Sequence, residues 1–137
     1  MSIQTSLRRL KLVLGGARVD REHPDLEGLR RQRDPEAFMW QILPHAARTF
    51  SACIALLPSH VARAAAVGYL YCRMLDTFED LHPDPVARKI ALQAFAARFD
   101  QESMAPPPAL PDAIHQDARD ATHLLLVERC DMVDEVF

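Results

Sequence analysis

The sequence predicts an all-α protein, and three observations lead to that fold class. Apolar residues recur at helical spacing in one segment after another. Prolines and capping residues separate these segments at intervals typical of helix boundaries. No stretch alternates apolar and polar residues or places a β-branched run between turns, which is the pattern expected of strands. We therefore expect about five helices and no sheet.

The composition is that of an ordinary globular domain with one core. The chain has 137 residues, of which 49% are hydrophobic and 26% charged. A net charge of -3 and a pI near 6.0 give no electrostatic footprint for nucleic acid, so we expect none as a partner. The three cysteines are widely spaced and predict reduced thiols. No apolar run is long enough to span a bilayer, and no signal peptide is expected.

Residues 1–33 are assigned to an N-terminal segment. Residues 3–14 place leucines at helical spacing among basic side chains, and Gly15 and Gly16 end the pattern. This basic helix is expected to pack on the domain, with contact to a membrane surface as the alternative. Residues 17–33 are polar and charged, which predicts a loop or a weak helix.

Residues 34–137 are assigned to the helical domain, and its first helix is expected to begin after Asp34. That aspartate supplies a capping carboxylate, and a proline and a glutamate follow it at the positions where helix starts favour them. We expect the helix to run toward Leu43. Pro44 lacks an amide hydrogen and disfavours helix at the residue before it, so a kink or boundary is predicted there.

The next two helices are expected over residues 45–57 and 60–81. Pro58 and Ser59 lie between them, and we expect this pair to close the first helix and cap the second. The first half of the second helix is almost wholly apolar, which is typical of a helix in a protein interior.

Two more helices complete the prediction. Asp84 and Pro85 give another helix start. The apolar residues of that amphipathic helix lie at positions 86, 90, 92, 95 and 99. The proline-rich residues 103–111 predict a stiff exposed connection, and a last helix is expected from near Asp112 toward Phe137.

A polar stripe interrupts the apolar helix over residues 60–81. At about 100° per residue, the side chains of Tyr69, Arg73, Asp76 and Asp80 fall within a sector of about 60°. An unpaired carboxylate in a packing seam is costly; Arg73 can neutralise one aspartate, and a divalent ion such as Mg²⁺ the other. Glu79 lies about 80° from the stripe and is a peripheral ligand at best. The alternative is an acidic helix end in solvent.

A second polar group lies on the helix expected over residues 45–57. Arg48, Thr49 and Ser51 surround Phe50 ahead of an apolar run. An arginine beside hydroxyl groups suits an oxyanion such as a phosphate. The simpler interpretation is a surface arginine on an amphipathic helix.

Taken together, the two segments resemble the squalene and phytoene synthase family. The sequence ARTFSACIALLP at 47–58 is followed by GYLYCRMLDTFED at 68–80. The family has a basic residue and a Ser/Thr-Phe pair, followed one helix later by a tyrosine, an arginine and the first aspartate-rich motif. LDTFED at 75–80 is particularly similar to squalene synthases. The resemblance covers roughly residues 37–100 and carries both motifs in the family's order.

The resemblance implies an all-α isoprenoid synthase fold with a central cavity. On the matching positions, Asp76 and Asp80 would hold Mg²⁺ ions that bridge a prenyl diphosphate. Glu79 matches a glutamate of the squalene synthase form of the motif and would be a third metal ligand. NADPH is a further cofactor if the product is squalene.

The substrate-binding and catalytic residues follow from the same match. The residues matched to substrate binding are Arg48, Thr49, Phe50, Ser51 and Arg73. Tyr69 matches a tyrosine near the reacting carbocation, where its ring and phenol oxygen stabilise positive charge. With Asp76 and Asp80 it makes up the expected catalytic set.

The chain departs from the family pattern in one respect. Family members are longer and carry a second aspartate-rich motif on a later helix. Asp131, Asp134 and Glu135 come too soon after the first motif to supply it, so we expect them on the solvated face of the last helix. We therefore expect an N-terminal part of the bundle that is inactive by itself and that self-associates or binds a complementary C-terminal half.

The function expected from these residues is the head-to-head condensation of two prenyl diphosphates. The enzyme would be a prenyltransferase of the farnesyl-diphosphate farnesyltransferase or phytoene synthase type. One alternative is a non-catalytic helical protein of the same descent that binds prenyl lipid or a partner, and another is an unrelated helical interaction domain. The expected location is cytoplasmic, with peripheral membrane contact as the variant.

Overall fold

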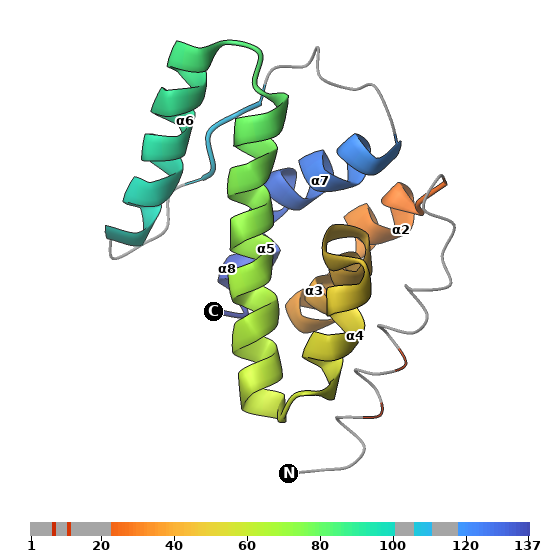
Figure 1. Cartoon of the computed structure of the whole chain (residues 1–137). Coiled ribbons are helices and arrows are strands. Elements are labelled where there is room, and N and C mark those ends of the chain that lie inside the picture. Colours follow the sequence, from red (N-terminus) through yellow and green to blue (C-terminus); the bar gives the residue numbers. More distant parts are fainter. Residues whose placement is uncertain (1–6, 8–10, 12–22, 101–105, 111–117) are drawn as a thin grey trace.

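The structure, a computed structural model, describes residues 7, 11, 23–100, 106–110 and 118–137 (Figure 1). Its helices are α2 (Leu26–Arg31), α3 (Pro35–Ala47), α4 (Thr49–Leu56), α5 (Ser59–Leu81), α6 (Pro85–Ala97), η1 (Arg98–Asp100), α7 (Ala118–Glu128) and α8 (Cys130–Asp134). No strand occurs in these described residues, and the all-α prediction is confirmed. Within them, no helix is long and apolar enough to cross a membrane.

The helix predicted over residues 3–14 lies outside the described residues except at two positions. Leu7 and Lys11 are both helical and exposed. In the segment predicted as loop or weak helix, α2 forms one short helix whose N-cap, Asp25, accepts a hydrogen bond from the Gly28 amide. Leu29 of α2 is buried in the core.

The 23-residue helix α5 is the centre of the bundle (Figure 1). It packs against α3, α4, α6 and α7. Its fully buried residues recur every four positions, and they are Ala62, Ala66, Leu70, Met74 and Phe78. Fully burying a side chain the size of Leu, Met or Phe contributes about 1.5–3 kcal/mol each, so this ridge is a main source of stability. The predicted helix over 60–81 is confirmed.

The boundary predicted at Pro44 is wrong. Pro44 lies inside α3 and is buried, and α3 continues to Ala47. The break comes at Arg48, whose backbone has φ 48° and ψ −121°. A non-glycine residue in such a conformation costs about 1–3 kcal/mol, so the surrounding packing must hold it. The preference of the residue before a proline for a non-helical conformation predicts a boundary, but Pro44 is buried against the core and the helix continues through it.

The predicted cap at the start of α5 is also wrong. Pro58 occupies the N-cap position, and Ser59 is already the first helical residue. The Ser59 hydroxyl is buried without a hydrogen-bond partner among the described residues. By contrast, the predicted start of α6 is confirmed, because the Asp84 carboxylate accepts hydrogen bonds from the amides of Val86 and Ala87.

Fewer apolar residues of α6 are buried than the amphipathic pattern of this helix predicts. Ala91 and Phe95 are buried, whereas Val86 is 70% and Ile90 61% exposed. The reason is that α6 packs on α5 and continues into η1, so only one side of the helix meets the core of the described bundle.

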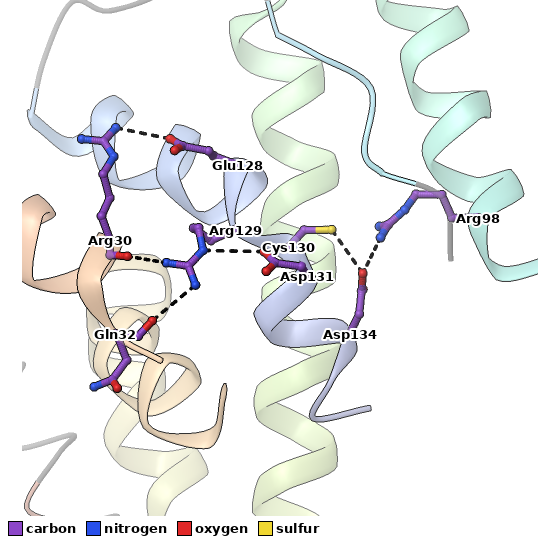
Figure 2. A network of polar contacts seen from close by, with 8 residues as sticks. All are labelled: Arg30, Gln32, Arg98, Glu128, Arg129, Cys130, Asp131 and Asp134. Atoms are coloured by element: carbon purple, nitrogen blue, oxygen red, sulfur yellow. Dashed lines mark hydrogen bonds and ion pairs between the residues drawn. The ribbon is translucent and has the colours of Figure 1, made fainter. Parts of the chain in front are cut away.

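The single last helix predicted from residue 112 to 137 is two helices where it is described. Residues 112–117 lie outside the described residues, α7 ends at Glu128 and α8 begins at Cys130. Between them, the Arg129 guanidinium donates to the backbone carbonyl oxygens of Arg30 and Gln32 at 2.6 and 3.3 Å (Figure 2). This contact satisfies carbonyl groups at the end of α2 and anchors the turn between α7 and α8.

Asp134 is not on a solvated face, contrary to the prediction. Its carboxylate accepts a hydrogen bond from Arg98, and Cys130 Sγ lies 3.5 Å from it (Figure 2). It also accepts a hydrogen bond of 2.8 Å from the Tyr71 hydroxyl. The Arg98 side chain is only 2% exposed and that of Asp134 18%. The turn at Arg129 produces this placement, because it directs α8 toward α5 and η1. Of the other two acids, Asp131 and Glu135 are exposed as predicted.

Burial changes the acidity of two groups in this network. Desolvation and the charge of Asp134 raise the pKa of the Cys130 thiol from 9.0 to about 12. Burial, and then the hydrogen bond to Asp134, raise the pKa of the Tyr71 hydroxyl above its ordinary value. Both groups therefore stay neutral in the folded protein at pH values where they ionise in the unfolded chain.

This difference predicts a loss of stability at alkaline pH. The contribution of these two groups to the free energy of unfolding should be constant up to about pH 8 and fall as the pH rises through 9 and 10, because the unfolded chain then releases protons that the folded chain retains. Urea unfolding at pH 7.5, 9 and 10 measures the slope. Cys130→Ala should show a shallower fall between pH 8.5 and 10, and an unchanged fall would contradict the raised pKa of the Cys130 thiol.

Burial of Cys130 also predicts a difference in thiol reactivity. At pH 7.5, a thiol reagent should modify the exposed Cys53 and Cys72 well before Cys130.

Candidate functional site

The break at Arg48 places the end of α3 and the start of α4 against the middle of α5. A cavity of about 240 Å³ lies there. It is lined by His45, Ala46, Ala47, Arg48, Thr49, Phe50, Tyr69, Arg73 and His123. Parts of the two predicted polar groups therefore meet at one cavity, and α7 contributes His123 to its lining. Ser51, Asp76 and Asp80 are not among the lining residues.

Aromatic rings form one side of the cavity. The rings of Phe50 and Tyr69 are stacked, with centroids 6.4 Å apart and planes inclined by 30°. Phe50 is 62% exposed, which leaves its ring accessible at the mouth of the cavity. Two electron-rich ring faces at this position can stabilise a nearby positive charge.

Basic side chains form the rest of the polar lining. The guanidinium of Arg73 is 3.6 Å from a carboxylate oxygen of Asp76, and its side chain is 20% exposed. The Nε of Arg73 is buried without a hydrogen-bond partner among the described residues, so protein groups do not fully satisfy this arginine. Arg48 is exposed at the same cavity. Two guanidinium groups that converge on a small cavity favour an anion with several oxygen atoms.

Ser51 is placed differently from the other matched residues. It is buried, and its hydroxyl donates to the backbone carbonyl of Arg48 at 2.6 Å. This hydrogen bond stabilises the strained turn that presents Arg48 and Thr49 to the cavity. Ser51 itself is not among the residues that line it.

The three carboxylates of the aspartate-rich motif lie at the C-terminal end of α5. The Asp76 side chain is 51% exposed, and Asp80 and Glu79 are exposed. The backbone carbonyl of Glu79 accepts a hydrogen bond from Arg88 at 2.9 Å. Among the described residues, no three His, Cys, Asp or Glu side chains are grouped as a metal site.

The carboxylates of the motif suit Mg²⁺ only if other groups complete the coordination shell of the ion. Mg²⁺ commonly takes one or two carboxylates and completes its octahedral shell with water and substrate phosphate oxygens. Asp76 and Asp80, one turn apart, can supply those carboxylates, with Glu79 at the edge. The described residues thus fit an ion that is shared with a phosphate ligand, and they do not form a protein-only cage.

Sequence reasoning missed two residues of the cavity, His45 and His123. His45 lies three positions before Arg48, and helical spacing was a usable signal for it. His123 gave no such signal, because it reaches the cavity from α7, which is distant in sequence.

A second cavity of about 530 Å³ lies on another side of α5. It is lined by His60, Arg63, Ala64, Val67, Gly68, Tyr71, Val136 and Phe137. Tyr71 is about 160° around the helix from Tyr69, so the two cavities lie on opposite faces. The Arg63 guanidinium donates to the Val136 carbonyl at 3.1 Å and is engaged within the protein. The smaller cavity therefore has the more suitable polar lining for a ligand.

One family model matches most of the chain. The family model for squalene/phytoene synthase matches residues 43–134, about two thirds of the 137-residue chain. The matched range contains every residue that lines the smaller cavity and all three carboxylates of the motif. No curated protein and no solved structure matches the chain significantly. The helical architecture is consistent with the all-α isoprenoid synthase fold, and the chain belongs to the squalene/phytoene synthase family.

Proposed function

We propose that the smaller cavity binds the diphosphate group of a prenyl diphosphate, and that the chain provides this half-site for the head-to-head condensation of two such substrates. One observation carries the proposal. Arg48, at the break between α3 and α4, and Arg73 of α5 line the same cavity as the stacked rings of Phe50 and Tyr69. A cationic region beside an aromatic one matches a substrate with an anionic head and an allylic carbon that becomes positive.

The chemistry follows from that arrangement. Cleavage of the allylic carbon–oxygen bond releases pyrophosphate, and the departing oxygens accumulate negative charge that Arg48 and Arg73 neutralise. When bound by Asp76 and Asp80, Mg²⁺ supplies Lewis acidity to the same leaving group. The allylic cation left behind is stabilised by the ring of Tyr69 and must be kept from water.

Ligand binding tests the proposal directly. Arg73→Gln should weaken binding of the unreactive analogue farnesyl S-thiolodiphosphate by about 10- to 100-fold, because charged hydrogen bonds to the diphosphate are lost. Tyr69→Phe should bind it as the parent does, since the ring is retained. Calorimetric titration in the presence of Mg²⁺ measures the affinities.

The matched control is Arg63→Gln, which removes the same charge from the opposite face of α5. It should leave affinity within about twofold of the parent, and circular dichroism should show equal helix content for all variants. Equal affinity of the parent and Arg73→Gln would refute the assignment of this cavity to the diphosphate.

A further inference from the structure

We propose that His123 binds the same diphosphate from the α7 side of the cavity, as a protonated imidazole. The proposal rests on the proposed function, because it assigns a further binding residue to that site. Neither motif of the family resemblance includes this residue, which belongs to a helix about 50 positions beyond Arg73.

The position of His123 is the first argument. It is 6% exposed, yet it lines the cavity together with Arg48 and Arg73. Helix α7 packs against both α3 and α5, the helices that carry most of the other lining residues, and it contributes His123 to the same cavity. The backbone around His123 is thus held by helix packing, which fixes the place of this residue at the cavity.

The chemistry of the side chain is the second argument. A protonated imidazole donates from both ring nitrogens, and a hydrogen bond from a cation to a phosphate oxygen is stronger than one between neutral groups. Histidine side chains change charge between about pH 5 and 8. A bound anion favours the charged form, so diphosphate binding through His123 should strengthen as the pH falls through this range.

Four other charged or titratable residues line the cavity with His123. His45 and Arg48 come from α3 and its end, and Tyr69 and Arg73 come from α5. The two other helices packed on α7, α2 and α8, contribute none of the described residues that line the cavity. Of this set, only His45 shares the pH range of His123, so the two histidines must be tested separately.

The experiment measures binding of inorganic pyrophosphate without Mg²⁺, at pH 6.0 and pH 8.0 and at constant ionic strength. His123→Gln should lose about tenfold in affinity at pH 6.0 and less than about threefold at pH 8.0. Pyrophosphate itself gains protons over this range, so the quantity compared is the ratio of parent to variant at each pH. His45→Gln, measured in the same way, shows how much of the change of affinity with pH comes from the His45 imidazole.

His60→Gln is the matched control, because His60 lines the cavity on the opposite face of α5. Its ratio to the parent should be close to one at both pH values. Since His123 is buried, His123→Asn is made as a second variant, and thermal unfolding of each is recorded. A partly unfolded variant would bind less at both pH values and would not reproduce the change of ratio with pH.

The outcomes separate this inference from the proposed function. If the parent binds no pyrophosphate, the proposed function is wrong and His123 has no ligand there. If the parent binds and Arg73→Gln binds weakly, but the His123 variants match the parent at both pH values, the function stands and the inference is overturned. An equal loss at both pH values would also overturn it, because the charge of the imidazole would then play no part.

Discussion

Asp76→Asn and Asp80→Asn should each remove most of the gain in diphosphate affinity that Mg²⁺ provides, at least about tenfold. The reason is that Asp76 contacts Arg73, which lines the cationic cavity, and that Asp80 lies one turn farther along α5. Without Mg²⁺, the expected effect of Asp76→Asn has the opposite sign. Asp76 lies 3.6 Å from the Arg73 guanidinium, so its removal frees that cation and eliminates a repulsive charge. Pyrophosphate should then bind as well as, or more tightly than, it binds to the parent.

This change of sign distinguishes a metal ligand from a structural ion pair. Titrations of pyrophosphate with and without Mg²⁺ give the ratio of affinities for each variant. Glu79→Gln should show a smaller loss, because Glu79 lies to the side of the stripe. Glu135→Gln, an exposed acid on the last turn of the described chain, serves as the control. Undiminished dependence on Mg²⁺ in both aspartate variants would show that the ion binds elsewhere.

Asp134→Asn should destabilise the fold by about 3–5 kcal/mol. The variant keeps the shape of the side chain but removes the negative charge that pairs with the Arg98 guanidinium, whose side chain is 2% exposed. The same substitution weakens the acceptor of the Tyr71 hydroxyl. Removing one partner of a buried ion pair is among the few single substitutions that lower the free energy of unfolding by this much.

Urea unfolding at pH 7.5 measures the loss, and the neighbouring acid Asp131 supplies a control. Its side chain is 63% exposed, so Asp131→Asn should change the free energy of unfolding by less than about 0.5 kcal/mol. The double variant Arg98→Met with Asp134→Leu should recover much of the stability, because apolar side chains of similar volume can replace a buried ion pair. A loss for Asp134→Asn no larger than that for Asp131→Asn would show that the pair contributes little.

The sequence by itself determined the features that depend on residues close together in the chain. Caps at Asp34 and Asp84 start their helices as predicted, because the bonds that they make reach only two or three residues forward. The polar stripe on α5 also follows from helical spacing alone. The two motifs led to the family that the comparison confirms. In each case the controlling interaction is local, so the order of residues is sufficient to specify it.

The tertiary structure decided the features that depend on distant contacts. Pro44 stays in a helix because it is buried, and the chain breaks instead at Arg48, which opens the cavity. Asp134 is paired with a side chain 36 positions earlier, and His123 joins the cavity from a helix that carries neither motif. No pattern of neighbouring residues predicts these contacts between distant parts of the chain. They arise because the packing of α7 against α3 and α5, and of α8 against α3, stabilises the fold by more than the local preferences cost.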